Sequence, residues 1–99
     1  MWNMQGTNNT ANGGWGQRIV RDINSGGYST LHTVGTLYDV YTGVQVNWRM
    51  RAMYNYMDTS HSTTSVITYK IQGAAYNGDQ VDFNDDSAVT SITLWEILA

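Results

Sequence analysis

Hydrophobic and polar residues alternate most strictly between Val46 and Tyr56. A period of two residues places successive side chains on opposite faces of a β-strand. Residues three and four apart in this segment mix polar with apolar types, which argues against a helix. The segment is therefore predicted to be a strand, and its apolar face consists of Val46, Trp48, Met50, Ala52, Tyr54 and Tyr56.

Shorter segments rich in alternating, β-branched and aromatic residues predict further strands. These are Trp15–Arg21, Tyr28–Val34, Ser65–Ala75, Val81–Phe83 and Thr90–Leu98. The chain contains no proline, so glycine, asparagine and aspartate must form the turns, as in the hairpin signals at Asn24–Gly27 and Asn77–Asp79. Polar composition predicts loops over Gly6–Gly14 and Asp58–Thr64.

Six or seven short strands without a helical segment predict an all-β fold, an antiparallel β-sandwich. A chain of 99 residues is long enough for one domain and too short for two, so residues 1–99 are expected to form a single domain. Residues 1–14 are expected to be a flexible or edge segment. The last strand, Thr90–Leu98, is apolar on both faces, so we expect an interface to cover it.

The charge content of the chain favours self-association over nucleic-acid binding. Charged residues make up only 13% of the sequence, about half the usual share, which weakens the protection against association that charge provides. The five cations form no run and the net charge is −3, so the sequence disfavours contact with several phosphates at once. The absence of cysteine excludes disulfides and thiolate metal sites.

The sequence also restricts where the protein is expected to act. Met1–Gly6 contains neither the basic nor the apolar region of a secretory signal, and no apolar stretch reaches the length of a membrane span. Neither secretion by the general route nor membrane insertion is therefore expected. The content of Trp, Tyr, Asn and Thr is nevertheless typical of proteins that face the outside. A virus particle released by lysis combines both properties.

No set of residues predicts catalysis or a cofactor. His32 and His61 lie in a predicted strand and a Ser/Thr-rich loop, and neither is accompanied by a nucleophile motif. One acidic cluster offers oxygen atoms of the kind that calcium binds. It consists of Asp79, Asp82, Asp85 and Asp86 with Asn84. No glycine follows at the spacing that a calcium loop requires, so a solvated turn is predicted, with calcium as the alternative.

The tryptophans are the remaining candidates for binding, because aromatic rings stack on sugars and also fill cores and interfaces. Trp48 and Trp95 lie within alternating segments and are expected in the core or an interface. Trp15 lies beside the glycine-rich loop and is the candidate platform for a ligand.

Several segments resemble a known domain when they are taken together in order. They are Gln17–Asp22 (QRIVRD), Arg49–Asp58 (RMRAMYNYMD), Ser65–Gln72 (SVITYKIQ) and Thr90–Ile97 (TSITLWEI). They resemble the C-terminal part of a jelly-roll-like β-sandwich domain of bacteriophage virion proteins, such as tail-fibre tips and capsid decorations of marine and cyanobacterial phages. That domain usually begins with one or two further strands, which this chain lacks or keeps only as Met1–Gln5.

The resemblance implies a structural protein of the virion that associates with itself, as a homotrimer, and with other virion proteins. A capsid decoration or cement role is favoured over a fibre tip because the chain is short. The expected interface consists of Trp48, Ile92, Leu94, Trp95 and Ile97. The alternative is a carbohydrate- or receptor-binding module of a tail fibre, in which Trp15 and surface tyrosines would bind a host glycan.

Overall fold

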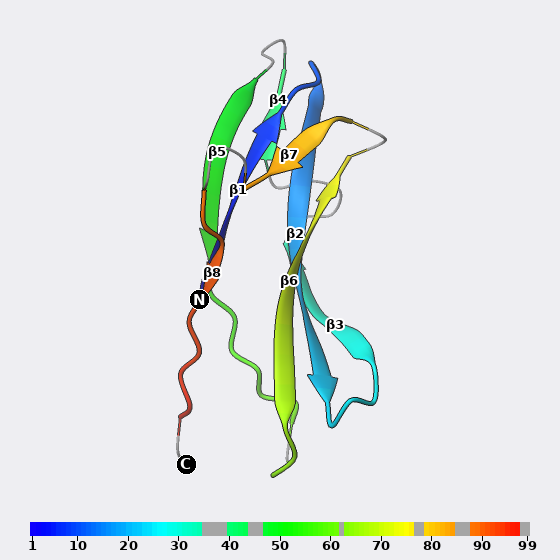
Figure 1. The fold of residues 1–99 in the computed structure, drawn as a ribbon, viewed down its shortest axis with the longest axis vertical. Helices are drawn as coiled ribbons and strands as arrows, with labels where there is room; N and C mark the ends of the chain where they lie inside the picture. The colour runs from blue at the N-terminus through cyan, green and yellow to red at the C-terminus, as the bar shows by residue number, and fades with distance from the viewer. Residues whose placement is uncertain (35–39, 44–46, 62, 77–78, 85–87, 98–99) are drawn as a thin grey trace.

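Two antiparallel β-sheets pack against each other in the computed structural model, which describes residues 1–34, 40–43, 47–61, 63–76, 79–84 and 88–97 (Figure 1). Sheet A contains β1 (Trp2–Asn8), β5 (Trp48–Tyr54), β7 (Val81–Phe83) and β8 (Ser91–Ile92). Sheet B contains β2 (Gly13–Ile23), β3 (Tyr28–Val34), β4 (Val40–Thr42) and β6 (Ile67–Ala75). The predicted all-β sandwich is confirmed. The described residues contain no helix that is long and apolar enough to cross a membrane.

Each sheet is built around one central strand. In sheet A, β5 pairs with the whole of β1, while β7 and β8 share the opposite edge of β1. In sheet B, β6 pairs with β2 from Trp15 to Ile23, while β4 and β3 follow each other along the other edge. The fold therefore depends on how β1 and β2 pack together.

The N-terminal segment corrects a prediction made from the sequence. Residues 1–14 were expected to be flexible or at an edge, but β1 is the central strand of sheet A and is largely buried. Its polar side chains tolerate burial because they have hydrogen-bond partners nearby. Gln5 donates to the Thr7 hydroxyl at 3.0 Å, and Asn8 donates to the Thr10 carbonyl at 2.9 Å. Polar composition therefore indicated a loop where a buried strand lies.

Two fully buried indoles join the two sheets. The Trp2 indole nitrogen of sheet A donates to the Gln17 side-chain oxygen of sheet B at 2.9 Å. The Trp15 ring of sheet B meets the Phe83 ring of sheet A edge to face, with 5.5 Å between centroids. Trp15 also covers the backbone of Gly6, because a side chain at that position would overlap the indole.

Sheet B extends further than sheet A, so the molecule is elongated, with principal extents of 48 × 24 × 22 Å. In Figure 1, β6 and the β2–β3 hairpin continue below the end of sheet A. The chain that follows β5 runs over this part of sheet B and takes the place of a strand. The inward residues Ile67, Tyr69 and Ile71 are consequently only half-buried, although their predicted common face is confirmed.

The C-terminal strand is shorter than expected. A strand was predicted over Thr90–Leu98, but only Ser91–Ile92 pairs with β1. Thr93 exchanges one further pair of backbone hydrogen bonds with Met1, and residues 94–97 then continue without a neighbouring strand among the described residues. A strand needs a neighbour as well as a suitable sequence, and no described strand lies beside residues 94–97.

Replacement of Gly6 by alanine tests the contact between the sheets. The added methyl group would lie 2.5 Å from a carbon of the Trp15 indole, so we expect Gly6→Ala to lower the free energy of unfolding by about 1–3 kcal/mol. Gly43→Ala is the matched control, because open space surrounds that position. Urea denaturation followed by tryptophan fluorescence measures both variants. Equal stabilities would contradict the packing of Trp15 on Gly6.

Candidate protein-interaction surface

The C-terminal segment of residues 91–97 is anchored at its start and exposed over its remaining length. Asn3 donates to the Ser91 hydroxyl at 2.5 Å, and Arg51 donates to the Val89 carbonyl at 2.7 Å. Beyond the pair formed with Met1, the side chains of Leu94, Trp95 and Ile97 are 62%, 81% and 73% exposed. A defined backbone position therefore presents a row of apolar side chains to solvent.

Because these side chains are exposed, the chain does not gain the hydrophobic stabilisation that their burial would provide. Burying an aromatic side chain removes roughly 150–250 Å² from water, so covering Trp95 would contribute at most about 4 kcal/mol before the costs of ordering and association are subtracted. Single exposed apolar residues are ordinary on protein surfaces, whereas a contiguous group marks a contact site. The described C-terminal segment has the properties of such a site.

The whole chain is less compact than a typical monomer of its mass. Its accessible surface is 6519 Å², against roughly 5,700 Å² for a compact monomer of this mass. Its radius of gyration is 15.1 Å, against about 13 Å for a compact chain of this length. The chain therefore exposes about 800 Å² more than a compact monomer would.

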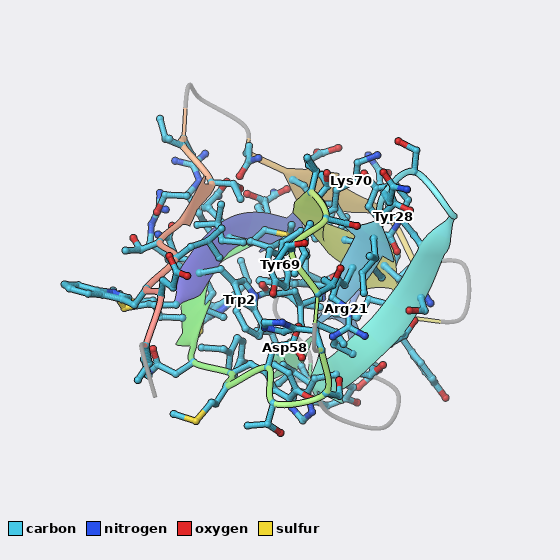
Figure 2. The ribbon with its side chains drawn as sticks, turned by 90° about the horizontal axis from the view of Figure 1, so that it is seen from below. Trp2, Arg21, Tyr28, Asp58, Tyr69 and Lys70 are labelled. Carbon is cyan, nitrogen blue, oxygen red and sulfur yellow. The ribbon has the colours of Figure 1, made fainter. Side chains whose placement is uncertain are left out.

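An ion pair holds the chain after β5 against the long half of sheet B. Figure 2 views the molecule from below and shows Arg21, Asp58 and Tyr69 close together. Arg21 donates to both carboxylate oxygens of Asp58 at 2.7 Å, and the Tyr69 hydroxyl donates to the same carboxylate at 3.0 Å. Arg21 and Tyr69 are paired neighbours on β2 and β6. These three residues form the clamp that fixes the loop.

Burial is the largest single influence on the pKa of Asp58, and it raises that pKa. The hydrogen bonds from Arg21, Ser60 and Tyr69 together outweigh burial and lower the pKa of Asp58 from 3.8 to about 2. Burial, followed by the hydrogen bond to Asp58, raises the pKa of Tyr69. The clamp therefore keeps the carboxylate charged and the phenol neutral over the ordinary pH range.

The clamp was not predicted from the sequence, although one signal could have indicated it. Arg21 continues the face of β2 that carries Trp15, Gln17 and Ile19, so a charge had to lie on an inward position. A buried charge needs a partner. Asp58, in contrast, lies in a segment that the sequence predicted to be a loop, and nothing in that segment indicates a contact with β2.

The interface residues predicted from the sequence occupy two different places. Ile92, Leu94, Trp95 and Ile97 lie together on the exposed C-terminal segment. Trp48 begins β5 and is half-buried, on the face of β5 that carries Tyr54. The Tyr54 ring lies 5.8 Å from Trp2, so this face packs within the chain. That Trp48 takes part in an interface between copies of the chain stays a prediction.

The predicted role of Trp15 as a ligand platform is wrong for this fold. Its side chain has no exposed surface, because Phe83 and Gly6 of sheet A cover it. A sugar needs an accessible ring face for stacking. The sequence placed Trp15 beside a flexible loop, whereas that loop belongs largely to β1 and β2.

The two histidines lie on the surface. His32 stacks on Tyr56 with 5.2 Å between ring centroids, which adds a contact between β3 and the loop after β5 to those that the clamp makes with β2 and β6. His61 is exposed in that loop. On the outer face of sheet B, the Lys70 ammonium lies 4.1 Å from the centre of the Tyr28 ring. None of these positions adds to the exposed C-terminal segment.

Two acids of the predicted turn have local structural contacts. Asp79 accepts a hydrogen bond from the Gly14 amide at 3.0 Å, and Asp82 accepts one from the Asn9 side chain at 2.8 Å. Asp85 and Asp86 lie outside the described residues. Among the residues that are described, no group of three or more acidic or histidine side chains is placed to hold a metal ion.

Comparison of the chain with protein-family models, with curated proteins and with solved structures finds no match.

The clamp predicts a loss of stability in acid. The pKa of Asp58 is lower in the folded chain than its ordinary 3.8, so its contribution is complete above pH 4 and is lost as the pH falls toward 2. A shift of this size corresponds to about 2 kcal/mol. We expect Asp58→Asn to lower stability at pH 7 and to remove this part of the acid dependence. Denaturant unfolding at several pH values measures it, with Asp82→Asn as the exposed control.

The acidic turn predicts no response to calcium. Its described carboxylates already accept protein hydrogen bonds, so millimolar calcium should leave the melting temperature unchanged. Differential scanning fluorimetry with calcium and with chelator measures the effect. A rise of several degrees that Asp85→Asn abolishes would reverse the prediction.

Proposed function

We propose that this chain is a structural protein of a bacteriophage virion and that it acts through contacts with other protein chains. The observation that carries the proposal is the exposed apolar segment formed by Leu94, Trp95 and Ile97, which a clamped and hydrogen-bonded sandwich presents to solvent. The low charge of the sequence supports it, because few charges oppose association. The resemblance of several segments to virion β-sandwich domains supports the viral setting.

The proposed role is that of a capsid decoration or cement protein, or of a fibre-tip component. Such a protein needs no reactive group, because its work is to bury surface between neighbouring chains. The chain would associate with copies of itself, as a homotrimer, and with other virion proteins. It would assemble in the host cytoplasm and leave with the particle by lysis.

The fold weakens the rival proposal of a carbohydrate-binding module. That proposal depended on Trp15, which lies in the core. Exposed tyrosines such as Tyr28 and Tyr41 remain, but Tyr28 contacts Lys70 on the outer face of sheet B. Tyr41 belongs to β4, which pairs with the other end of β2. The two rings therefore do not form one platform.

Substitution of Trp95 tests association through the C-terminal segment. A charge placed in a dry contact costs several kcal/mol, so we expect Trp95→Asp to dissociate an oligomeric parent while the folded sandwich persists. Tyr41→Asp is the control, because it changes an exposed aromatic residue at the other end of the molecule. Light scattering at micromolar concentration measures mass, and circular dichroism verifies folding. A monodisperse monomeric parent that binds no hydrophobic dye would overturn the proposal.

The viral setting is tested separately by the genes that flank this one. Capsid or tail genes on either side would support a virion part. Polysaccharide-degrading genes, together with a glycan-array signal from the parent chain, would favour the binding module instead.

A further inference from the structure

The open edges of the two sheets differ in how well they are protected against pairing with another chain. Exposed strand edges are commonly protected by charges, bulges or short length. Strand β5 carries Arg49 and Arg51. In the β2–β3 ladder, Ile19 pairs with His32 and Val20 with Thr30, so Leu31 of β3 is a bulge. The other outer strands β4, β7 and β8 have three residues or fewer.

Strand β6 lacks these protections. It has nine residues and pairs with β2 without a register shift, and no described strand pairs with its other edge. Its one charged residue is Lys70, whose ammonium lies over the Tyr28 ring of β3 in the free chain (Figure 2). Strand addition would require Lys70 to leave this ring and turn toward an acidic partner at the open edge. A long, regular and nearly uncharged edge is a template for strand addition.

We propose that the open edge of β6 accepts residues 93–97 of a second copy of this chain as an added antiparallel strand. The inference rests on the proposed function only in requiring self-association. The donor segment is extended, carries no proline and has no strand beside it past Thr93 within the described residues. All strand pairings in the described residues are antiparallel, so the added strand continues the existing pattern.

The pattern of side chains fixes the register. Lys70 is the one charge on β6, and Glu96 is the one charge on the donor segment. When these two residues lie opposite each other, Trp95 pairs with Ile71 and Ile97 pairs with Tyr69. Both donor side chains then extend the half-buried inward face of sheet B. A shift by one residue would turn Glu96 to that apolar face and Trp95 to the polar one, which disfavours it.

The area available and the charge pair identify a second copy as the occupant. The excess surface of about 800 Å² per chain equals what each partner buries in a standard protein interface. The donor and the acceptor lie on different parts of the same chain, so each copy offers both. Figure 1 places the donor segment and β6 on opposite sides of the loop after β5, which favours exchange between copies over pairing within one. A donor-to-acceptor contact of this kind forms closed rings such as trimers when the rotation between copies closes, and open filaments when it does not.

Cysteine crosslinking tests the register, because the chain has no cysteine of its own. We mix the single variants Glu96→Cys and Lys70→Cys and oxidise them under mild conditions. Directly opposed residues in antiparallel strands have separations that suit a disulfide. A covalent heterodimer is expected, with little Glu96→Cys homodimer. Thr33→Cys replaces Lys70→Cys in the control, because it lies on the outer face of β3 at the other edge of sheet B.

Charge reversal supplies an independent measurement on variants that keep the sandwich intact. Glu96→Lys and Lys70→Glu should each weaken association by about two- to fivefold, and the double variant should regain the parent affinity. Sedimentation equilibrium measures all of them.

The outcomes separate this inference from the proposed function. A parent that forms oligomers but gives no crosslink between positions 96 and 70, or crosslinks equally to position 33, overturns strand addition and leaves self-association standing. A disulfide that forms within single chains of the Glu96→Cys/Lys70→Cys double variant also overturns exchange between copies. A parent that stays monomeric at all concentrations overturns both proposals.

Discussion

The packing of Trp2 and Trp15 between the two central strands is the interaction on which the rest of the fold depends. Trp2 reaches from β1 to Gln17 of β2, and Trp15 reaches from β2 to the backbone of Gly6 in β1. The other strands of each sheet pair with one of these two. Both indoles are fully buried, which concentrates the apolar contact between the sheets in a small volume.

The apolar contacts between the sheets gather around Trp2 and Trp15, and the part of sheet B that extends past sheet A has no second sheet to cover it. The chain after β5 covers part of the exposed face and is held there by the ion pair between Arg21 and Asp58. A buried ion pair adds little net stability compared with apolar packing, yet it becomes costly when one partner is removed. It therefore fixes the position of the loop more than it strengthens the sandwich.

The same constraint explains why apolar surface remains exposed. The C-terminal segment leaves sheet A where β1 begins, so its apolar residues pass beside the part of the molecule that lacks a second layer. Leu94, Trp95 and Ile97 have little in the described chain to pack against.

The sequence alone determined the class of the fold and the apolar character of the C-terminal segment. Period-two patterns such as those of β5 and β6 depend only on the alternation of side chains along a strand, so they can be seen without tertiary structure. Only the tertiary structure decided that Gln5, Thr7 and Asn8 form a buried central strand, because hydrogen-bond partners make polar residues compatible with a core. Tertiary structure alone also buried Trp15 and joined Arg21 to Asp58, which lie 37 residues apart in the chain. Contacts between residues so far apart in the sequence cannot be inferred from local composition.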